Sequence, residues 1–329
     1  MGTNINLEKR FLTTLEKAAR LLGKSPQELR RDEYVRITVD HDIPDRLNKV
    51  ELNDLGGWGI AKKLYVPTAL DGPKILVMDI ETFPIEAYVW GIWQQNIGLN
   101  QIKQDWTVLS WAAKWVGTNE VFYMDQRNAE NIRDDKELIK EMWELLDEAD
   151  IVVGQNSKAF DIKKLNARFL AHGMKPPSSF KQVDTKILAK RHFGFTSNKL
   201  EYMTETFCLS KKTHHKQYPG FELWKACLNG DIKAFKECEK YNIDDVLSTE
   251  ELYTKLIPWD SSFSNSVYSN GDSHICSCGC DSFRNAGYYY TQVGKYKKYC
   301  CKSCGSEYRD AENLLDKSKR KSIKRRTVR

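Results

Sequence analysis

The chain has 329 residues, of which 41% are hydrophobic and 29% are charged, and this length predicts one main domain with one or two smaller additions. No stretch approaches the roughly 20 apolar residues of a membrane span, and the charged N-terminus excludes a signal peptide, so we expect a cytoplasmic protein. The net charge is +6, but the last thirteen residues carry eight Lys and Arg, which leaves 6 − 8 = −2 for the rest.

The first elements we expect are helices. Apolar residues recur at helical spacing over residues 7–22, and the sequence SPQE at 25–28 combines a capping serine, a proline and a glutamate in the positions that begin a helix. Residues 8–65 are similar to the small helical repeats that accompany homing endonucleases, which implies DNA binding. A helical cap packed on the main domain explains the same pattern, so both interpretations of residues 1–70 stay open.

The main domain is expected at residues 73–258, because Gly72 and Pro73 mark a boundary before a β-rich apolar run. Its expected strands are residues 74–80, 86–92, 107–115, 119–125 and 150–154. Its expected helices are residues 137–149, 160–173, 185–194, 199–207 and 231–256. Strands followed by alternation with helices predict a mixed α/β fold, and Pro258 ends the last helix.

Acidic residues lie on one of these predicted strands and at the start of one of the predicted helices. Asp79 and Glu81 in the sequence VMDIET are two residues apart on a predicted strand, so their side chains point to one face about 6.5 Å apart. In GQNSKAFD, a strand runs into a turn with Asn156, and Phe160 and Asp161 begin a helix. Alone, the first pair also fits a strand-end turn, and Asp161 also fits a helix-start acid.

A third acidic motif, YNIDD, lies on the long helix predicted at 231–256. Tyr241 and Asp245 are four residues apart and share a helical face, whereas Asp244 points about 100° away. A solvated helical face is the alternative, although the apolar neighbours Ile243 and Val246 disfavour it. We therefore select Asp245 as the candidate ligand, with the Tyr241 phenol placed beside it.

Together DIET, NxxxFD and YxxxD resemble, in this order, the three motifs of the DEDDy subclass of DnaQ-like 3′-5′ exonucleases, over about residues 73–258. The motifs are most similar to those of the proofreading domains of family B DNA polymerases. The resemblance implies an RNase H-like mixed β-sheet flanked by helices and two Mg²⁺ or Mn²⁺ ions. It assigns metal ligation to Asp79, Glu81, Asp161 and Asp245, water orientation to Tyr241, and substrate contacts to Ile80, Thr82, Asn156 and Phe160.

The implied function is removal of nucleotides from the 3′ ends of DNA, single-stranded or frayed. The absence of a polymerase domain after the motifs suggests a bacteriophage protein of replication, proofreading or recombination, with a separate polymerase or replisome component as partner. Two alternatives stay open: an exoribonuclease of the same fold and an inactive nucleic-acid-binding protein.

Several further residues have two interpretations each. Asp184 fits a secondary acid of the proofreading domains or a helix N-cap. The basic stretch of Lys211, Lys212, His214, His215 and Lys216 fits phosphate contact or a solvated loop. Exposed tryptophans can stack on bases whereas buried ones belong to the core, and this choice applies to Trp90, Trp93, Trp106 and Trp111.

Six of the nine cysteines fall between Cys276 and Cys304, which indicates metal binding in a reducing compartment. The pattern looks like a zinc ribbon at residues 275–310, two ligand pairs joined by a hairpin. We expect one structural Zn²⁺ held by Cys276, Cys278, Cys301 and Cys304. The first pair has two alternatives, Cys278 with Cys280 and Cys276 with Cys280, and His274 is a weaker alternative ligand. In the selected arrangement, Cys280 and Cys300 do not ligate.

The remaining segments join or follow this ribbon. Residues 259–274 are rich in Ser, Asn and Gly, which indicates a linker. The tail at 311–329 is basic and attracts phosphate, although solubilising tails have the same composition. Basic residues around the ribbon make DNA binding there a separate hypothesis: Lys295, Lys297, Lys298 and Arg309.

Overall fold

The computed structural model describes residues 72–327 except 211–216, 263, 269–273 and 326. The chain divides into two units, Met1–Asp71 and Gly72–Arg329, and only the second is described. The expected helical region at 1–70 and the basic stretch at 211–216 therefore lie outside the described residues. Within the described part, no helix is long and apolar enough to cross a membrane.

A five-stranded sheet forms the centre of the main domain, with the strand order β5-β4-β1-β6-β7. β1 lies in the middle, antiparallel to β4 and parallel to β6. The strands are β1 (Ile75–Thr82), β4 (Val108–Trp115), β5 (Val121–Asp125), β6 (Ile151–Gly154) and β7 (Lys181–Asp184). The expected mixed α/β class is confirmed.

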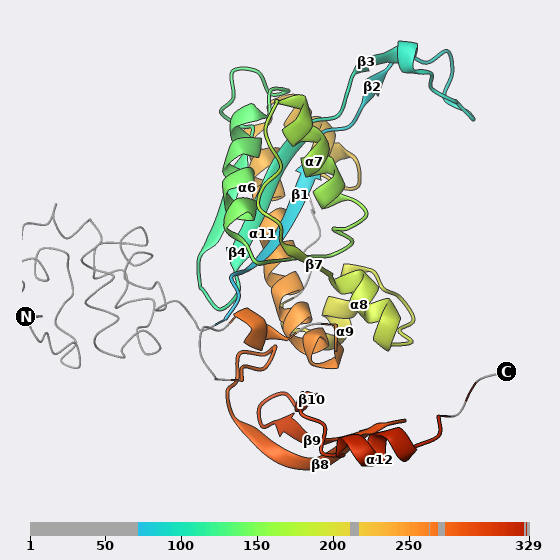
Figure 1. Cartoon of the computed structure of the whole chain (residues 1–329). Helices are drawn as coiled ribbons and strands as arrows, with labels where there is room; N and C mark the ends of the chain where they lie inside the picture. The colour runs from blue at the N-terminus through green and yellow to red at the C-terminus, as the bar shows by residue number, and fades with distance from the viewer. Residues whose placement is uncertain (1–71, 211–216, 263, 269–273, 326, 328–329) are drawn as a thin grey trace, which may run out of the picture. The chain divides into compact units, whose positions relative to one another are not determined.

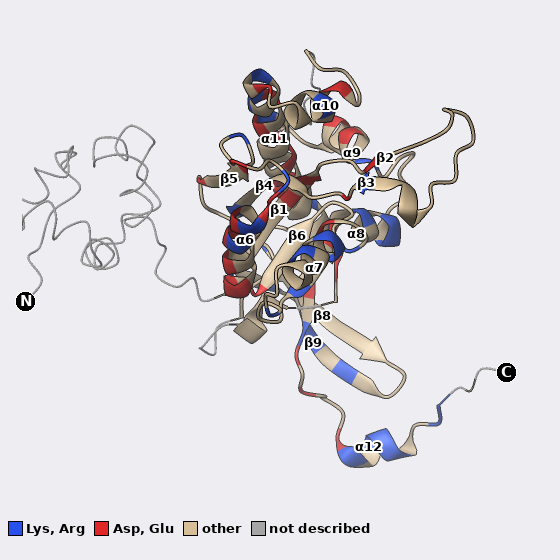
Figure 2. Cartoon of the chain, turned by 90° about the horizontal axis from the view of Figure 1, so that it is seen from above, with Lys and Arg blue, Asp and Glu red and all other residues tan. Residues whose placement is uncertain are grey.

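Helices cover both faces of this sheet, with α6 and α7 on one side and α11 on the other (Figures 1 and 2). β1 packs both ways because its side chains alternate: Leu76, Met78 and Ile80 lie in the core beneath α6 and α7, whereas Val77 packs with α8, α9 and α11. The helices are α6 (Lys136–Glu148), α7 (Asp161–Ala171), α8 (Thr185–His192), α9 (Leu200–Phe207), α10 (Glu222–Leu228) and α11 (Ile232–Leu256), with 3-10 turns η4 (Ile257–Trp259) and η5 (Asn265–Tyr268) after them.

The prediction of a strand at residues 86–92 is wrong beyond Ala87. Only β2 (Glu86–Ala87) forms, and it pairs with β3 (Ile102–Gln104) to make a two-stranded arm, residues 86–104, that includes the turn η3 (Leu99–Gln101). At the end of the arm Trp90 and Ile92 are fully exposed. Strand formation stops because residues 88–98 have no partner strand within the described part of the chain.

A separate three-stranded sheet of order β10-β9-β8 follows the 3-10 turns. Its strands are β8 (Phe283–Thr291), β9 (Gly294–Cys301) and β10 (Glu307–Arg309), and we call this sheet with its cysteines the ribbon. The basic tail then contains the short helix α12 (Lys317–Ser322), which Asp316 caps at the N-terminus.

Candidate active site

The two acids of β1 share one face of the sheet, as their spacing predicts, and in the structure this face is the one toward α10 and α11. Asp79 accepts a hydrogen bond on Oδ2 from Asn242 Nδ2 at 2.7 Å, and Glu81 accepts one on Oε2 from Trp224 Nε1 at 3.1 Å. Between them, Ile80 points into the opposite core. The carboxylates of Asp79 and Glu81 thus lie on the same face, each held by a residue from a different helix.

Asn242 connects the long helix α11 to the strands that carry the site. It is completely buried, and its amide oxygen accepts a hydrogen bond from Ser110 Oγ at 3.2 Å while its amide nitrogen donates to Asp79. Ser110 on β4 lies directly opposite Glu81 in the strand register. Asn242 therefore fixes the position of α11 against both β1 and β4.

Asp161 reaches β1 at the level where β6 no longer pairs with it. The two strands pair only up to Val77, so the N–H of Ile80 donates instead to Asp161 Oδ1, at 3.1 Å. Asp161 is 3% exposed. Burial, helped by the charge of nearby Asp184, raises the pKa of its carboxyl to about 7 against the lowering effect of the Ile80 N–H.

The turn from β6 to α7 has a tight geometry that places Asp161. A Cβ at Gly154 would lie 2.7 Å from the Cβ of Ser157, so only glycine fits there. Asn156 adopts φ +64°, and its N–H donates to Asp184, which also caps α8 through the N–H groups of Lys186 and Ile187. Asp184 therefore has the helix-cap role, one of its two expected interpretations.

Asp245 and Tyr241 come from α11. Asp245 is 4% exposed and lies three residues after Asn242, so it shares the helical face that contacts β1. The ring of Tyr241 meets the ring of Trp224 edge to face, with the centroids 6.5 Å apart. Trp224 thus contacts both Glu81 and Tyr241, and Figure 2 shows acidic segments of α11 beside β1 and β4.

Sequence reasoning missed Asn242 and Trp224. Asn242 follows Tyr241 directly within the third motif, and its position on the inner face of α11 is the signal that could have found it. Trp224 lies on α10, a helix that the sequence did not predict, and its contact with Glu81 spans 143 residues. No local pattern marks such a contact.

The expected substrate contacts lie in different environments. Ile80 is 3% exposed and packs in the core, Thr82 ends β1 at a register shift, and Phe160 is 38% exposed. Among the tryptophans, Trp111 is a core residue that donates to the Leu138 carbonyl oxygen, and Trp106 lies under the ammonium group of Lys164 at 3.5 Å. Contacts of these residues with a nucleotide remain predictions.

The donor set fits divalent cations. Carboxylate oxygens are the ligands that Mg²⁺ and Mn²⁺ prefer, and two of the four carboxylates, those of Asp161 and Asp245, are buried. The raised pKa of Asp161 shows that its negative charge is unfavourable in the protein alone. A cation near it would reverse that effect, because an opposite charge stabilises the carboxylate.

The ribbon brings together four sulfur atoms. Within the described residues, one group of three or more potential ligands is compact: the sulfur atoms of Cys276, Cys278, Cys301 and Cys304, within 4.8 Å of one another. These are the four cysteines expected to bind Zn²⁺. Burial raises the pKa of the Cys276 and Cys278 thiols, whereas the N–H groups of Cys304 and Ser303 and the neighbouring thiols lower the pKa of Cys301 to about 6 against the effect of its own burial. A thiolate is the form that ligates a metal.

The cysteines and histidine outside this group have other contacts. Cys280 Sγ accepts a hydrogen bond from the N–H of Ser282, and Cys300 Sγ donates to the carbonyl oxygen of Gly305. The imidazole of His274 packs against Phe283 and Tyr308. The structure thus offers a four-thiolate set without any of these three residues.

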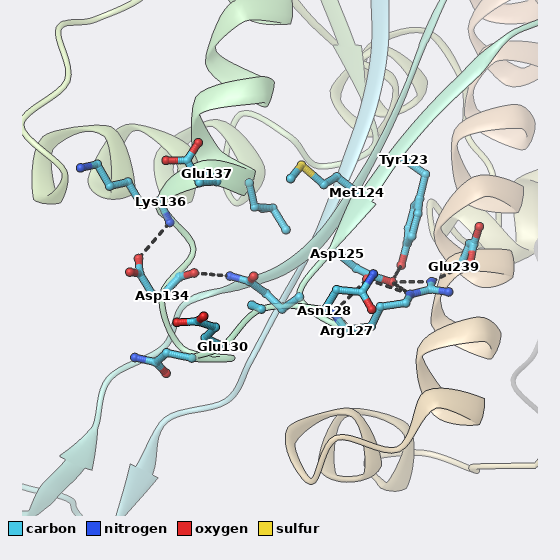
Figure 3. Close-up of a pocket in the computed structure, with 14 residues that line it drawn as sticks. Tyr123, Met124, Asp125, Arg127, Asn128, Glu130, Asp134, Lys136, Glu137 and Glu239 are labelled. Carbon is cyan, nitrogen blue, oxygen red and sulfur yellow. Dashed lines mark hydrogen bonds and ion pairs between the residues drawn. The ribbon is translucent and has the colours of Figure 1, made fainter. Parts of the chain in front are cut away.

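A cavity of about 710 Å³ lies beside β5 (Figure 3). Asp125 in its wall faces Ser110, which faces Glu81, so the cavity is level with the acidic end of β1. Arg127 pairs there with Asp125 and with Glu239 of α11. The wall carries two cations and five carboxylates: Arg127, Lys136, Asp125, Glu130, Asp134, Glu137 and Glu239. This excess of negative charge disfavours phosphate binding in the cavity.

Comparisons with known proteins relate part of the main domain to one superfamily. A family model described as the RNase H superfamily matches residues 97–257, a range that includes Asp161, Tyr241 and Asp245. The solved family B DNA polymerase of the hyperthermophilic archaeon Pyrobaculum calidifontis is 20% identical, with a TM-score of 0.42, over 57% of this chain and 25% of the polymerase chain. A comparison with curated proteins found no match. The family match, together with the five-stranded mixed sheet and its flanking helices, indicates an RNase H-like domain of mixed α/β fold in the matched region.

Proposed function

We propose that this protein is a metal-dependent 3′-5′ exonuclease that removes nucleotides from DNA ends. The observation that carries the proposal is the set of contacts around the end of β1. The Asn242 amide donates a hydrogen bond to Asp79, and the backbone N–H of Ile80 donates one to Asp161. Trp224 donates to Glu81 and packs against the ring of Tyr241. These contacts gather the residues of three distant motifs at one end of one strand.

In this proposal, Asp79, Glu81, Asp161 and Asp245 hold two divalent ions. Such ions supply Lewis-acid stabilisation of a phosphate and lower the pKa of water. The Asn242 amide keeps the Asp79 carboxylate directed at the site, and the Trp224 N–H does the same for Glu81. The Tyr241 phenol orients the attacking water, and the exposed Phe160 ring contacts the terminal nucleotide.

The finer assignments come from the motif resemblance alone. They are the DEDDy subclass, the preference for DNA, and a role in bacteriophage replication, proofreading or recombination alongside a separate polymerase. The ribbon adds one structural Zn²⁺ on four cysteines, since a sheet with so small a core needs the metal to fold. Residues 1–70 are assigned as an accessory region and residues 259–274 as a linker.

The test is digestion of short single strands of DNA and RNA, labelled at the 5′ or the 3′ end. We expect the 5′-labelled DNA to shorten stepwise when Mg²⁺ or Mn²⁺ is added and to stay intact without added metal. A DNA strand with a blocked 3′ end should persist. Degradation that starts at the 5′ end, or that Asp79→Ala leaves unchanged, would refute the proposal.

A further inference from the structure

The hairpin of β8 and β9 has two different aromatic faces. Cross-strand partners point to the same side of an antiparallel pair, and Tyr288 pairs with Lys297 while Tyr290 pairs with Lys295. These four residues therefore form one face, which we call the Tyr–Lys face. Tyr289 points to the opposite side, paired with Tyr296.

The Tyr–Lys face is exposed and positively charged. Tyr288 and Tyr290 are 48% and 64% exposed, and the ammonium group of Lys295 lies 3.9 Å from the centroid of the Tyr288 ring. In the described part of the chain, neither Lys295 nor Lys297 forms an ion pair with a carboxylate. The face thus offers two aromatic rings and two cations that are not paired with any carboxylate of the described residues.

The opposite face has its contacts within the protein. Lys298 forms an ion pair with Glu307 at 3.0 Å, and the guanidinium of Arg309 lies 4.2 Å from the centroid of the Tyr296 ring. Tyr289 is 46% exposed there, close to the exposure of Tyr288. At similar aromatic exposure, the two sides therefore differ in acid pairing: Lys298 on the opposite face is paired with Glu307, whereas both lysines of the Tyr–Lys face, like Arg309, have no carboxylate partner among the described residues.

The basic tail is attached beside the Tyr–Lys face. The N–H of Leu314 donates to the carbonyl oxygen of Lys295 at 2.8 Å, and the side chain of Asn313 accepts from the Lys295 N–H. The segment that leads into α12 is thereby held along β9. Figure 2 shows Lys and Arg on both the hairpin and α12.

We propose that the Tyr–Lys face binds single-stranded nucleic acid. Unpaired bases stack on Tyr288 and Tyr290, and Lys295 and Lys297 contact the phosphates between them. Single strands are favoured because the bases of a duplex are already stacked on one another. This inference extends the proposed exonuclease function by a second contact with the strand, and it uses none of the active-site carboxylates.

Charge separates this face from the exposed aromatic residues of the arm. The arm at residues 86–104 also exposes Trp90 and Trp93, but no charged residue lies between Glu86 and Lys103. That stretch offers no Lys or Arg side chain to pair with a phosphate. Of these two surfaces, the Tyr–Lys face is the one whose charge complements a nucleic acid.

The experiment measures fluorescence anisotropy of a labelled 20-nucleotide dT strand with the full-length protein carrying Asp79→Ala. Adding Tyr290→Ala should weaken binding about tenfold, as expected for loss of one stacked base. Tyr289→Ala, a neighbour of similar exposure on the opposite face, is the matched control and should change binding less than twofold. Both variants should retain equal zinc content, which verifies the ribbon.

Two further measurements make the test decisive. Lys297→Gln should reduce the slope of log affinity against log salt concentration by about 0.7, the value for one lost phosphate contact on a single strand. Equal losses for Tyr289→Ala and Tyr290→Ala, an unchanged slope, or tighter binding of a duplex or a poly-aspartate peptide would overturn the inference. Because this experiment measures binding without hydrolysis, it can contradict the Tyr–Lys face proposal without contradicting the proposed exonuclease function, and the digestion experiment can do the reverse.

Discussion

The acidic site and the cysteine group are held in place by different means. The acids lie at the end of β1, a strand whose residues are enclosed by two large hydrophobic clusters. In the ribbon, the buried residues among 275–310 are all small: Cys276, Ser277, Gly294, Cys300, Cys301 and Ser306. A fold with an apolar core can position ligands before any metal binds, whereas a ribbon of this kind depends on its metal.

The largest expected effect is therefore on the ribbon. Cys301→Ser should abolish zinc binding, a loss that corresponds to about 10–16 kcal/mol for structural zinc sites. Limited proteolysis should then cleave the ribbon but leave the RNase H-like domain intact, and elemental analysis should report the metal. Cys280→Ser, with its sulfur outside the group, should retain about one zinc per chain. Zinc retained in Cys301→Ser would contradict the ligand assignment.

The acidic site should make the unfolding free energy depend on pH. The pKa of Asp161 is raised to about 7 in the folded, metal-free protein, above the value of an ordinary Asp in the unfolded chain. As pH rises from about 4 to about 7, the unfolded chain releases this proton and the folded protein keeps it, so the free energy of unfolding falls. Relative to Asp161→Asn, the native chain should lose about 4 kcal/mol of unfolding free energy across that range.

Urea unfolding at several pH values measures this difference, and saturating Mg²⁺ should reduce it by stabilising the carboxylate. A difference between native and Asp161→Asn protein that is constant from pH 4 to pH 8 would show that Asp161 ionises normally. In that case the buried acid would give no reason to expect a cation beside it.

Asn242 tests whether the fold positions the acids without metal. Asn242→Leu removes the hydrogen bonds to Ser110 and Asp79 inside the core, so unfolding free energy should fall by about 2 kcal/mol. If Asn242 also directs the Asp79 carboxylate, kcat should fall about tenfold at saturating Mg²⁺. A stability loss with unchanged kcat would make Asn242 purely structural.

The smallest effect is expected at Trp224. Trp224→Phe keeps an aromatic ring beside Tyr241 but removes the N–H that contacts Glu81, which should lower kcat about fivefold, or about 1 kcal/mol. Trp143→Phe is the matched control, because it removes an N–H bond to the Lys175 carbonyl oxygen from α6, which packs on the opposite face of the sheet from α11. Equal effects of the two substitutions would remove Trp224 from the site.

The same comparison explains what the sequence could predict. Alternation placed Asp79 and Glu81 on one face of β1, helical spacing preferred Asp245 to Asp244, and the cysteine pattern selected the four sulfur atoms that lie together. These are short-range features. Trp224 and Asn242 could not be found this way, because their contacts with β1 arise from packing across 143 and 163 residues.

Partner availability accounts for the errors in secondary structure. Residues 86–92 have strand-like composition, yet Glu86 and Ala87 are the part of this segment that pairs with a strand, β3. The reverse holds for β7, Lys181–Asp184, which is a strand because β6 pairs with it, although its sequence KQVD is too short and polar to indicate one.

The central claim, a carboxylate site built on β1 and α11, is tested most directly by two neighbouring substitutions. Asp245→Asn and Asp244→Asn make the same chemical change one residue apart, and Asp245 lies on the face of α11 that includes Tyr241 and Asn242. Metal-dependent release of mononucleotides from a 5′-labelled DNA strand should fall about 1,000-fold in Asp245→Asn, equivalent to about 4 kcal/mol. It should change less than threefold in Asp244→Asn. Equal losses in both variants, or full activity in Asp245→Asn, would contradict the account.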